Sequence, residues 1–433
     1  MSGTGYPAIL NDPRAGSAGR IEALEAFAQG LKGMPAFTGE INNHIHTIYS
    51  FSPYTPAMAA LKAREAGLEA AGSVDHDSYA AAGEMRRACE ILGLGSVTGF
   101  ELRVSLKHTE FGERKINSPD SRGIAYITVQ GIPAGKAGAV RDFLAPISAA
   151  RQERNRLMTG NINSILAASG IEGLDYDRDI LPLSMRSEGG SVTERHLLYA
   201  LALKLIDEAG RGEGLLKFLK DKFSLEARGK NLGYLLDADN PFYTYDLLGL
   251  LKGSFNDRTF IQPNAEECPA AETVTAFAKS INAVPSYAYL GDVSDSVTGD
   301  KKAEKFEDQY LEELIPRLKD FGFQGVTYMP PRNTAEQLKR LHVLCAAEGF
   351  IEISGVDINS PRQSFNCPEI RRPEFAGLLD TTWALAGHEK LASGCPERGL
   401  FNPADPLADR PLNERVAAFA EIGRQGVKFP QRG

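Results

Sequence analysis

The sequence predicts an α/β protein in which a parallel sheet or barrel is interrupted by a long helical segment. Two observations predict this fold class. Short apolar stretches alternate with helical patterns from residue 41 to residue 105 and again from residue 284 to residue 359, as in βαβ units. Between residues 133 and 283 this alternation stops, and long amphipathic helical patterns replace it.

The elements follow one another in a regular order. The first part of the sheet is expected to have strands at 41–47, 72–77, 96–104 and 123–132, with helices at 55–67 and 79–92. The second part is expected to have strands at 283–292, 325–330 and 350–359, with helices at 307–322 and 334–349. Periodic apolar residues predict helices at 139–168, 193–207 and 214–223 between the two parts, and at 374–386 and 412–424 after them.

These patterns divide the chain into four parts. The N-terminal segment is rich in Gly and Pro, has one short helical pattern at 21–31, and is expected to be flexible. A barrel, a helical insertion that caps it, and a C-terminal helical extension follow. The expected boundaries are 1–36 for the N-terminal segment, 37–132 with 284–365 for the barrel, 133–283 for the insertion and 366–433 for the extension.

Composition narrows the classes of function. The 433 residues include 48 Lys and Arg against 56 Asp and Glu, a formal net charge of −8, and no basic tract. This balance argues against broad binding of nucleic acids or anionic membranes. Since no apolar run approaches the ~18 residues of a membrane helix and the start lacks the pattern of a secretion signal, we expect a soluble, cytoplasmic protein. The 5 Cys form no CxxC pair, so neither a disulfide framework nor a cysteine zinc site is indicated.

Side chains that commonly bind metals stand at the ends of predicted strands. His44 and His46, in N-H-I-H-T, point to the same side of an extended strand. His76 ends the second strand in V-D-H-D, Glu101 lies in the third in G-F-E-L, and Asp357 follows the last in G-V-D-I-N. Each motif alone has an ordinary explanation, such as a turn, a helix cap or an exposed strand position. Together, at the strand ends where barrels hold active sites, they predict a metal centre.

The order of these motifs resembles the polymerase-and-histidinol-phosphatase (PHP) superfamily of metal-dependent phosphoesterases. The matching segments are HIHT, VDHDS, GFEL and the late run 325–359, so the resemblance covers about 40–130 and 284–360. It implies a distorted (β/α)7 TIM-like barrel of PHP type, with a metal cluster, often trinuclear, at the carboxyl ends of the strands. The ligands that the resemblance assigns to the first metal are His44, His46, Glu101 and Asp357.

The chain departs from the PHP pattern at other ligand positions. Phe51, Tyr289 and Asn359 stand where the superfamily has further ligands. A phenyl ring offers no lone pair to a cation, and a phenol or an amide is a poor substitute for imidazole. We therefore expect one ion per chain unless other side chains substitute. The residues that could substitute are His108, Asp292 and His196. Two histidines and two carboxylates suit Zn²⁺, Mn²⁺ or Fe²⁺ better than Mg²⁺ or Ca²⁺.

Two helix starts in the insertion are candidates for binding an anion. Arg151, Arg154 and Arg156 lie close together in one helix, and Arg195 and His196 open another. Both segments are similar to parts of PHP phosphatases whose helical insertion supplies basic residues to phosphate. Arg side chains and helix N-termini suit phosphate oxygens. The alternative is a solvated helix face whose Arg side chains pair with nearby Glu.

These residues lead to three hypotheses. The first is a metal-dependent phosphoesterase that hydrolyses a small-molecule or nucleotide phosphate ester through a metal-activated water. In it Arg154, Arg195 and His196 bind the substrate, and His76 with Asp77 supports the ligands or transfers protons. The second is a mononuclear hydrolase of a carboxylic ester, lactone or amide. The third is a metal-stabilised binding protein without activity. The substrate, the oligomeric state and any lid motion of the insertion are left open.

Overall fold

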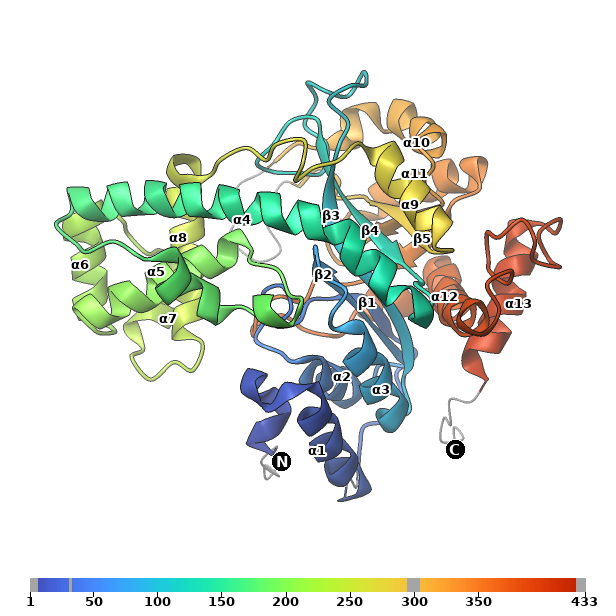
Figure 1. The fold of residues 1–433 in the computed structure, drawn as a ribbon, viewed down its shortest axis with the longest axis horizontal. Helices are drawn as coiled ribbons and strands as arrows, with labels where there is room; N and C mark the ends of the chain where they lie inside the picture. Colours follow the sequence, from blue (N-terminus) through green and yellow to red (C-terminus); the bar gives the residue numbers. More distant parts are fainter. Residues whose placement is uncertain (1–6, 31–32, 294–303, 426–433) are drawn as a thin grey trace.

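A computed structural model describes residues 7–30, 33–293 and 304–425. Within these ranges, seven strands form one sheet in the order β1 to β7, so that each strand pairs with its neighbours in the sequence. The sheet nearly closes, because Ile358, just after the last strand, forms a parallel bridge with Ile45 at the end of the first. With its surrounding helices (Figure 1), this arrangement confirms the predicted TIM-like α/β barrel with additional helices.

The strands are largely buried, and all except β3 are short. Their bounds are β1 (Ile41–Ile45), β2 (Ala70–His76), β3 (Gly95–Ser105), β4 (Ile124–Gln130), β5 (Val284–Ala288), β6 (Gly325–Tyr328) and β7 (Ile351–Ser354). All pairings are parallel except those of β4, which runs antiparallel to both β3 and β5. A parallel pair needs a crossover connection, usually a helix, and no helix lies between β3 and β4 in the described chain. One strand of the barrel is therefore reversed.

Four helices on the outside connect the parallel strands. They are α2 (Pro56–Glu65), α3 (Ala82–Leu92), α10 (Leu311–Asp320) and α11 (Ala335–Glu348). Thr55 caps α2 by accepting a hydrogen bond from the Met58 amide, with Pro56 in the first helical position. Thr334 and Gln337 form a capping box at the start of α11. These local signals explain why the sequence places the starts of α2 and α11 within one residue, whereas α3 and α10 start three and four residues later than expected.

The insertion between β4 and β5 has a hydrophobic core of its own. Its helices are α4 (Ala137–Ala168), α5 (Glu194–Ala209), α6 (Glu213–Phe223), α7 (Gly229–Leu236), α8 (Tyr243–Thr259) and α9 (Ala271–Ser280). In α4, Val140 and Leu144 pack into the barrel core, whereas Ile162 and Leu166 pack into the core of the insertion. Figure 1 shows α4 extending from the barrel along α5 and α8. This one helix therefore links the two cores.

The C-terminal extension covers the amino-terminal end of the barrel. It contains α12 (Ala376–Gly394) and α13 (Leu412–Arg424). The Trp383 ring lies against Gly95, the first residue of β3, so closely that a Cβ there would lie 2.6 Å from the ring. Glu389 accepts hydrogen bonds from the amide and the hydroxyl of Thr98 in β3. The barrel is thus closed off at the end opposite the predicted metal ligands.

The described part of the N-terminal segment packs against the barrel, while the expected flexibility of residues 1–36 stays a prediction. Helix α1 (Gly16–Gly30) buries Leu24 completely. Arg20 donates to both carboxylate oxygens of Glu84 in α3, at 2.9 and 2.7 Å, and both side chains are buried. The pairing joins residues 64 positions apart, which local composition cannot reveal. Residues 1–6 and 31–32 of this segment lie outside the described residues.

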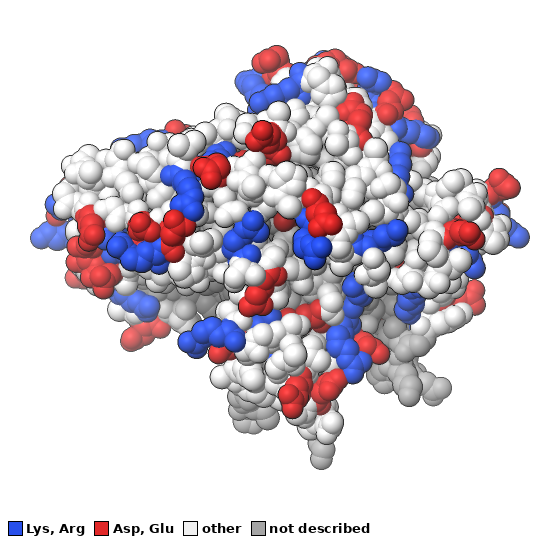
Figure 2. Space-filling view, viewed as in Figure 1, with Lys and Arg blue, Asp and Glu red and all other residues white. Residues whose placement is uncertain are grey.

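The described residues on the face of the molecule shown in Figure 2 form no broad patch of one charge sign. On the face shown in Figure 2, cationic and anionic side chains are interspersed. Among the described helices, none combines the length and the apolar character needed to cross a bilayer.

Candidate metal centre

The ends of β1, β2 and β7, with Glu101 inside β3, bring the predicted ligands together at one end of the barrel. His44 lies in β1 and His46 directly follows that strand. His76 is the last residue of β2, and its partner in the β3 register is Glu101. Asp357 lies three residues after β7. Because β1, β2, β3 and β7 are parallel neighbours around the barrel, their carboxyl ends meet at one place.

Closure of the barrel positions Asp357 beside the histidines. The amide of Ile358 donates to the carbonyl of His44 at 3.0 Å, and the amide of His46 donates to the carbonyl of Ile358 at 2.9 Å. At Gly355 the chain passes so close to β1 that a Cβ would lie 2.5 Å from the Cβ of His44. Only glycine allows this approach without displacing the backbone.

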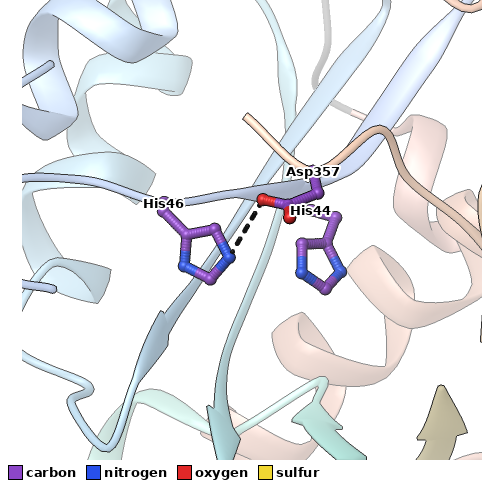
Figure 3. A group of neighbouring side chains, drawn as sticks. All are labelled: His44, His46 and Asp357. Carbon is purple, nitrogen blue, oxygen red and sulfur yellow. Dashed lines mark ion pairs between the residues drawn. The ribbon is translucent and has the colours of Figure 1, made fainter. Parts of the chain in front are cut away.

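The ligand atoms lie within a few ångströms of one another. The Oε2 atom of Glu101 lies 3.7 Å from His44 Nε2, 3.6 Å from His46 Nε2 and 3.0 Å from His76 Nδ1. His46 Nε2 also lies 3.3 Å from Asp357 Oδ1, the pair marked in Figure 3. Among the described residues, two groups of three side chains could each hold an ion, because the potential ligand atoms within a group lie within 4.8 Å of one another. Both groups include His46. One group adds His44 and Asp357, and the other adds His76 and Glu101.

Burial and neighbouring charges shift the pKa values of the side chains in this centre. Burial opposes the charged form of His46, but the carboxylates of Asp357 and Glu101 raise its pKa to about 8. Burial lowers the pKa of His76 to about 3. Burial also favours protonation of Glu101, yet His76, His44 and His46 hold the pKa of this carboxyl below its ordinary value.

Supporting hydrogen bonds orient two of the ligands. The Asp75 carboxylate accepts from the amide and hydroxyl of Thr47 and from the hydroxyl of Ser50, each at 2.6 Å. Ser50 Oγ lies 3.4 Å from His46 Nδ1, on the opposite side of the ring from Glu101 and Asp357. Asn359 donates to Asp357 Oδ1 at 2.7 Å. Such contacts fix the ring and carboxylate orientations that a metal needs. The sequence did not predict this role of Ser50 and Asp75. Asp75 lies within the VDHD motif, and Ser50 lies three residues after HIHT.

The donor set fits a divalent transition metal. His46 Nε2 and His76 Nδ1 are buried and lack a hydrogen-bond partner, yet each lies near a carboxylate oxygen. A buried polar atom without a partner costs free energy, and a cation shared with the carboxylates would remove that cost. Imidazole nitrogens with carboxylate oxygens are ligands that Zn²⁺, Mn²⁺ and Fe²⁺ accept. The identity of the metal and the number of ions stay predictions.

Phe51 and Tyr289, which stand where the PHP pattern has further ligands, contact other side chains. The Phe51 ring packs edge-on against His196 at 5.0 Å between ring centres and also meets Tyr199 of the insertion. The Tyr289 hydroxyl donates to Asp308 Oδ1 at 2.6 Å. Of the possible substitutes, His108 pairs with Glu272 in an exposed position, and Asp292 accepts from the Phe306 amide.

Asp77 and Arg154 belong to a buried cluster of charges between the insertion and the barrel. The cluster contains Arg103, Arg151, Arg154, Asp77, Glu194 and Glu267. Arg151 Nε lies 2.8 Å from Asp77 Oδ2 and 3.1 Å from Glu267 Oε1. Arg154 donates to Glu267 and to Glu194. The chain turns at Asp77, whose φ is 49°, and directs this carboxylate towards α4. The predicted roles of Asp77 in proton transfer and Arg154 in substrate binding stay predictions.

The two predicted anion ligands of α5 lie in different surroundings. His196 Nδ1 accepts from the Thr193 amide at 2.9 Å in the helix cap, and burial lowers the pKa of this imidazole to about 3. Arg195 stacks near Phe51, with Cζ 6.0 Å from the ring centre. Burial opposes ionisation of Asp357, but His46, His44 and Arg195 hold its pKa low. The predicted contacts of Arg195 and His196 with a substrate stay predictions.

Comparisons with known proteins support the fold. No family model matches the sequence, and no curated protein matches it significantly. A candidate metal-dependent phosphoesterase from Bifidobacterium adolescentis is 19% identical, with a TM-score of 0.49 over 78% of this chain and 96% of that chain. An amidohydrolase from Chromobacterium violaceum, solved with bound sulfate and no metal, is 17% identical, with a TM-score of 0.51 over 78% and 95%. At such identities the likeness concerns the fold.

Proposed function

We propose that this chain is a PHP-type metal-dependent hydrolase of a small-molecule phosphate ester, such as a nucleotide. The observation that carries the proposal is the convergence of three imidazoles and two carboxylates at one barrel end. Such convergence of metal-type donors suits the hydrolysis of an anionic substrate. The similar fold of the amidohydrolase is consistent with the proposal that this chain is a hydrolase.

The residues of the centre have distinct roles in this proposal. His44, His46, Glu101 and Asp357 would hold one ion. His44, His46 and Asp357 form one group of potential ligand atoms, and Glu101 Oε2 lies 3.7 and 3.6 Å from the Nε2 atoms of His44 and His46. His76 lies beside Glu101. When bound, such an ion supplies a water of lowered pKa and a positive charge for a phosphoryl oxygen. Arg195 would donate hydrogen bonds to the other phosphate oxygens. The Ser50 and Asp75 contacts would keep the His46 ring oriented during turnover.

A second candidate function is hydrolysis of a carboxylic ester, lactone or amide. It is favoured by Phe51 and Tyr289, which replace two expected ligands and contact other residues. Fewer ligands suit a single ion, and one ion suffices to activate water for attack on a carbonyl. Phosphoryl transfer gains more from a pair of ions that contact both the attacking and the leaving oxygen.

The first experiment is elemental analysis of protein purified without chelator. We expect about one transition-metal ion per chain, and its loss in His44→Ala. The matched control is His108→Ala, since His108 is an exposed histidine paired with Glu272. Absence of metal from the wild-type protein, or equal metal content in both variants, would contradict the proposed centre.

The second experiment separates the two candidate reactions. Metal-loaded wild type and Glu101→Ala are assayed against phosphomonoesters and cyclic phosphates, and in parallel against carboxylic esters, lactones and amides. Turnover of phosphate esters that Glu101→Ala abolishes supports the first function. Turnover of only the carbonyl substrates supports the second. Metal binding without turnover of any substrate would overturn both and leave a binding protein.

A further inference from the structure

The loop that carries Asp357 is attached to the insertion by Arg362. Arg362 Nε and Nη2 donate to the two carboxylate oxygens of Asp246 in α8, at 2.7 and 2.8 Å. Its Nη2 also donates to Asn240 at 3.2 Å. The guanidinium lies over the ring of Tyr234 in α7, with Cζ 3.6 Å from the ring centre. The insertion therefore holds this guanidinium by a forked ion pair and by stacking.

The surroundings of Arg362 are ordered by the insertion itself. Asn240 is buried, and its amide group donates to Asp246 Oδ2 at 2.7 Å and to the Tyr234 carbonyl at 2.9 Å. The Phe242 ring centre lies 5.2 Å from the Arg362 Cζ. Isolated surface ion pairs contribute little, but a forked pair with a nearly buried carboxylate and two aromatic neighbours is geometrically constrained.

Hydrogen bonds within the loop connect Arg362 to the metal ligand. The side-chain oxygen of Gln363, the next residue, accepts from the amides of Asn359 and Ser360, both at 2.7 Å. Asn359 in turn donates to Asp357 Oδ1. Residues 357–363 thus form one tight turn with the ligand at one end and the attachment to α7 and α8 at the other.

We propose that Arg362 is a positioning residue that couples the insertion to the metal centre. By fastening the 357–363 turn to α7 and α8, it holds the Asp357 carboxylate in the orientation that metal binding requires. This inference rests on the metal centre of the proposed function. Asn359, which stands where the PHP pattern has a further ligand, serves here as the connection between Arg362's turn and Asp357.

The test compares metal affinity and loop protection in the full chain. The variants are Arg362→Ala, Arg362→Lys, Asp246→Asn and the double variant Arg362→Ala with Asp246→Asn. The matched control is Arg156→Ala, because Arg156 forms a forked pair with Asp177 at 2.8 and 2.7 Å and stacks on Tyr176 wholly within the insertion. The measurements are Mn²⁺ titration calorimetry on chelator-treated protein, the absorption spectrum of the Co²⁺ form, and hydrogen exchange of residues 355–363 in the metal-free protein.

We expect Arg362→Ala to raise the Mn²⁺ Kd about tenfold and to change the Co²⁺ spectrum, as loss of supporting contacts does at other metal centres. Arg362→Lys should fall between wild type and Arg362→Ala, since Lys keeps the charge but loses the fork. The double variant should match the single variants, because both remove one interaction. Exchange at 355–363 should rise in Arg362→Ala and not in Arg156→Ala.

Two outcomes would overturn this inference without affecting the proposed function. One is wild-type affinity, spectrum and exchange in Arg362→Ala, and the other is equal weakening in Arg156→Ala. If wild-type protein binds no metal, the proposed function fails, and the hydrogen exchange of residues 355–363 then decides by itself whether Arg362 holds the turn.

Discussion

The hydrogen-bond partner of Tyr289 indicates a structural role for this side chain instead of a metal-binding one. The PHP resemblance expects a histidine ligand there, but the Tyr289 hydroxyl donates to Asp308, which also accepts from Gln337. We expect Tyr289→Phe to lower the free energy of unfolding by about 1 kcal/mol, the contribution of one such hydrogen bond. Metal content should not change. Urea unfolding and elemental analysis measure the two quantities, and loss of metal in Tyr289→Phe would show that the phenol is a ligand after all.

For single residues, the sequence predicts which side chains can bind a metal or an anion, but it does not predict which side chains they contact. His44 and His46 could be placed on one side of a strand because side-chain alternation is local. Arg154 could not be assigned its partner, because Glu267 is 113 positions away. His196 carries the chemistry of a ligand or of an anion contact, but the amide of Thr193 engages one of its nitrogens. Such pairings depend on the folded backbone, which residue spacing does not specify.

At the scale of elements, the buried charge cluster fastens α4 of the insertion to the ends of β2 and β3. Glu267 accepts hydrogen bonds from Arg103, Arg151 and Arg154. We expect Glu267→Gln to lower the free energy of unfolding by about 3–5 kcal/mol, because three buried guanidinium groups then lose one of their counter-charges. Urea unfolding measures the change. The control is Glu266→Gln at the exposed neighbouring position, and equal stability of the two variants would refute this role.

The elements themselves were largely predictable. Capping residues such as Thr55 and Thr334 mark helix starts locally, and apolar runs mark strands. The reversal of β4 was missed because strand direction depends on the connection and not on the strand's own residues. The packing of α1 was missed because it depends on the distant partner Glu84.

At the scale of the whole molecule, Glu389 connects the C-terminal extension to the barrel interior. Burial raises its pKa to about 8, against the opposing effects of Arg86 and Thr98. The folded state then holds a proton that an unfolded glutamate, with a pKa near 4.3, has lost. Stability from this group is therefore present at low pH and falls as the pH rises towards 8.

We expect the free energy of unfolding to fall by about 1–2 kcal/mol between pH 6 and pH 8 through this group. Glu389→Gln should remove that part of the pH dependence, whereas Glu397→Gln, at an exposed position of the same extension, should retain it. Urea unfolding at several pH values gives the comparison. An identical slope in wild type and Glu389→Gln would rule out the protonated carboxyl.

The seam between β1 and the turn after β7 has a consequence for how the protein is made. Asn42 and Val356, which exchange hydrogen bonds across this seam, are 314 positions apart. A ribosome therefore delivers the histidines long before it delivers Asp357, and the nascent chain cannot assemble the full ligand set until nearly all of the barrel has emerged. Contacts of such long range also slow folding, because closing a long loop costs entropy before the contact forms. An ion bound at the proposed centre would therefore stabilise the chain only after the barrel has closed, because its binding free energy is added to the closed form alone.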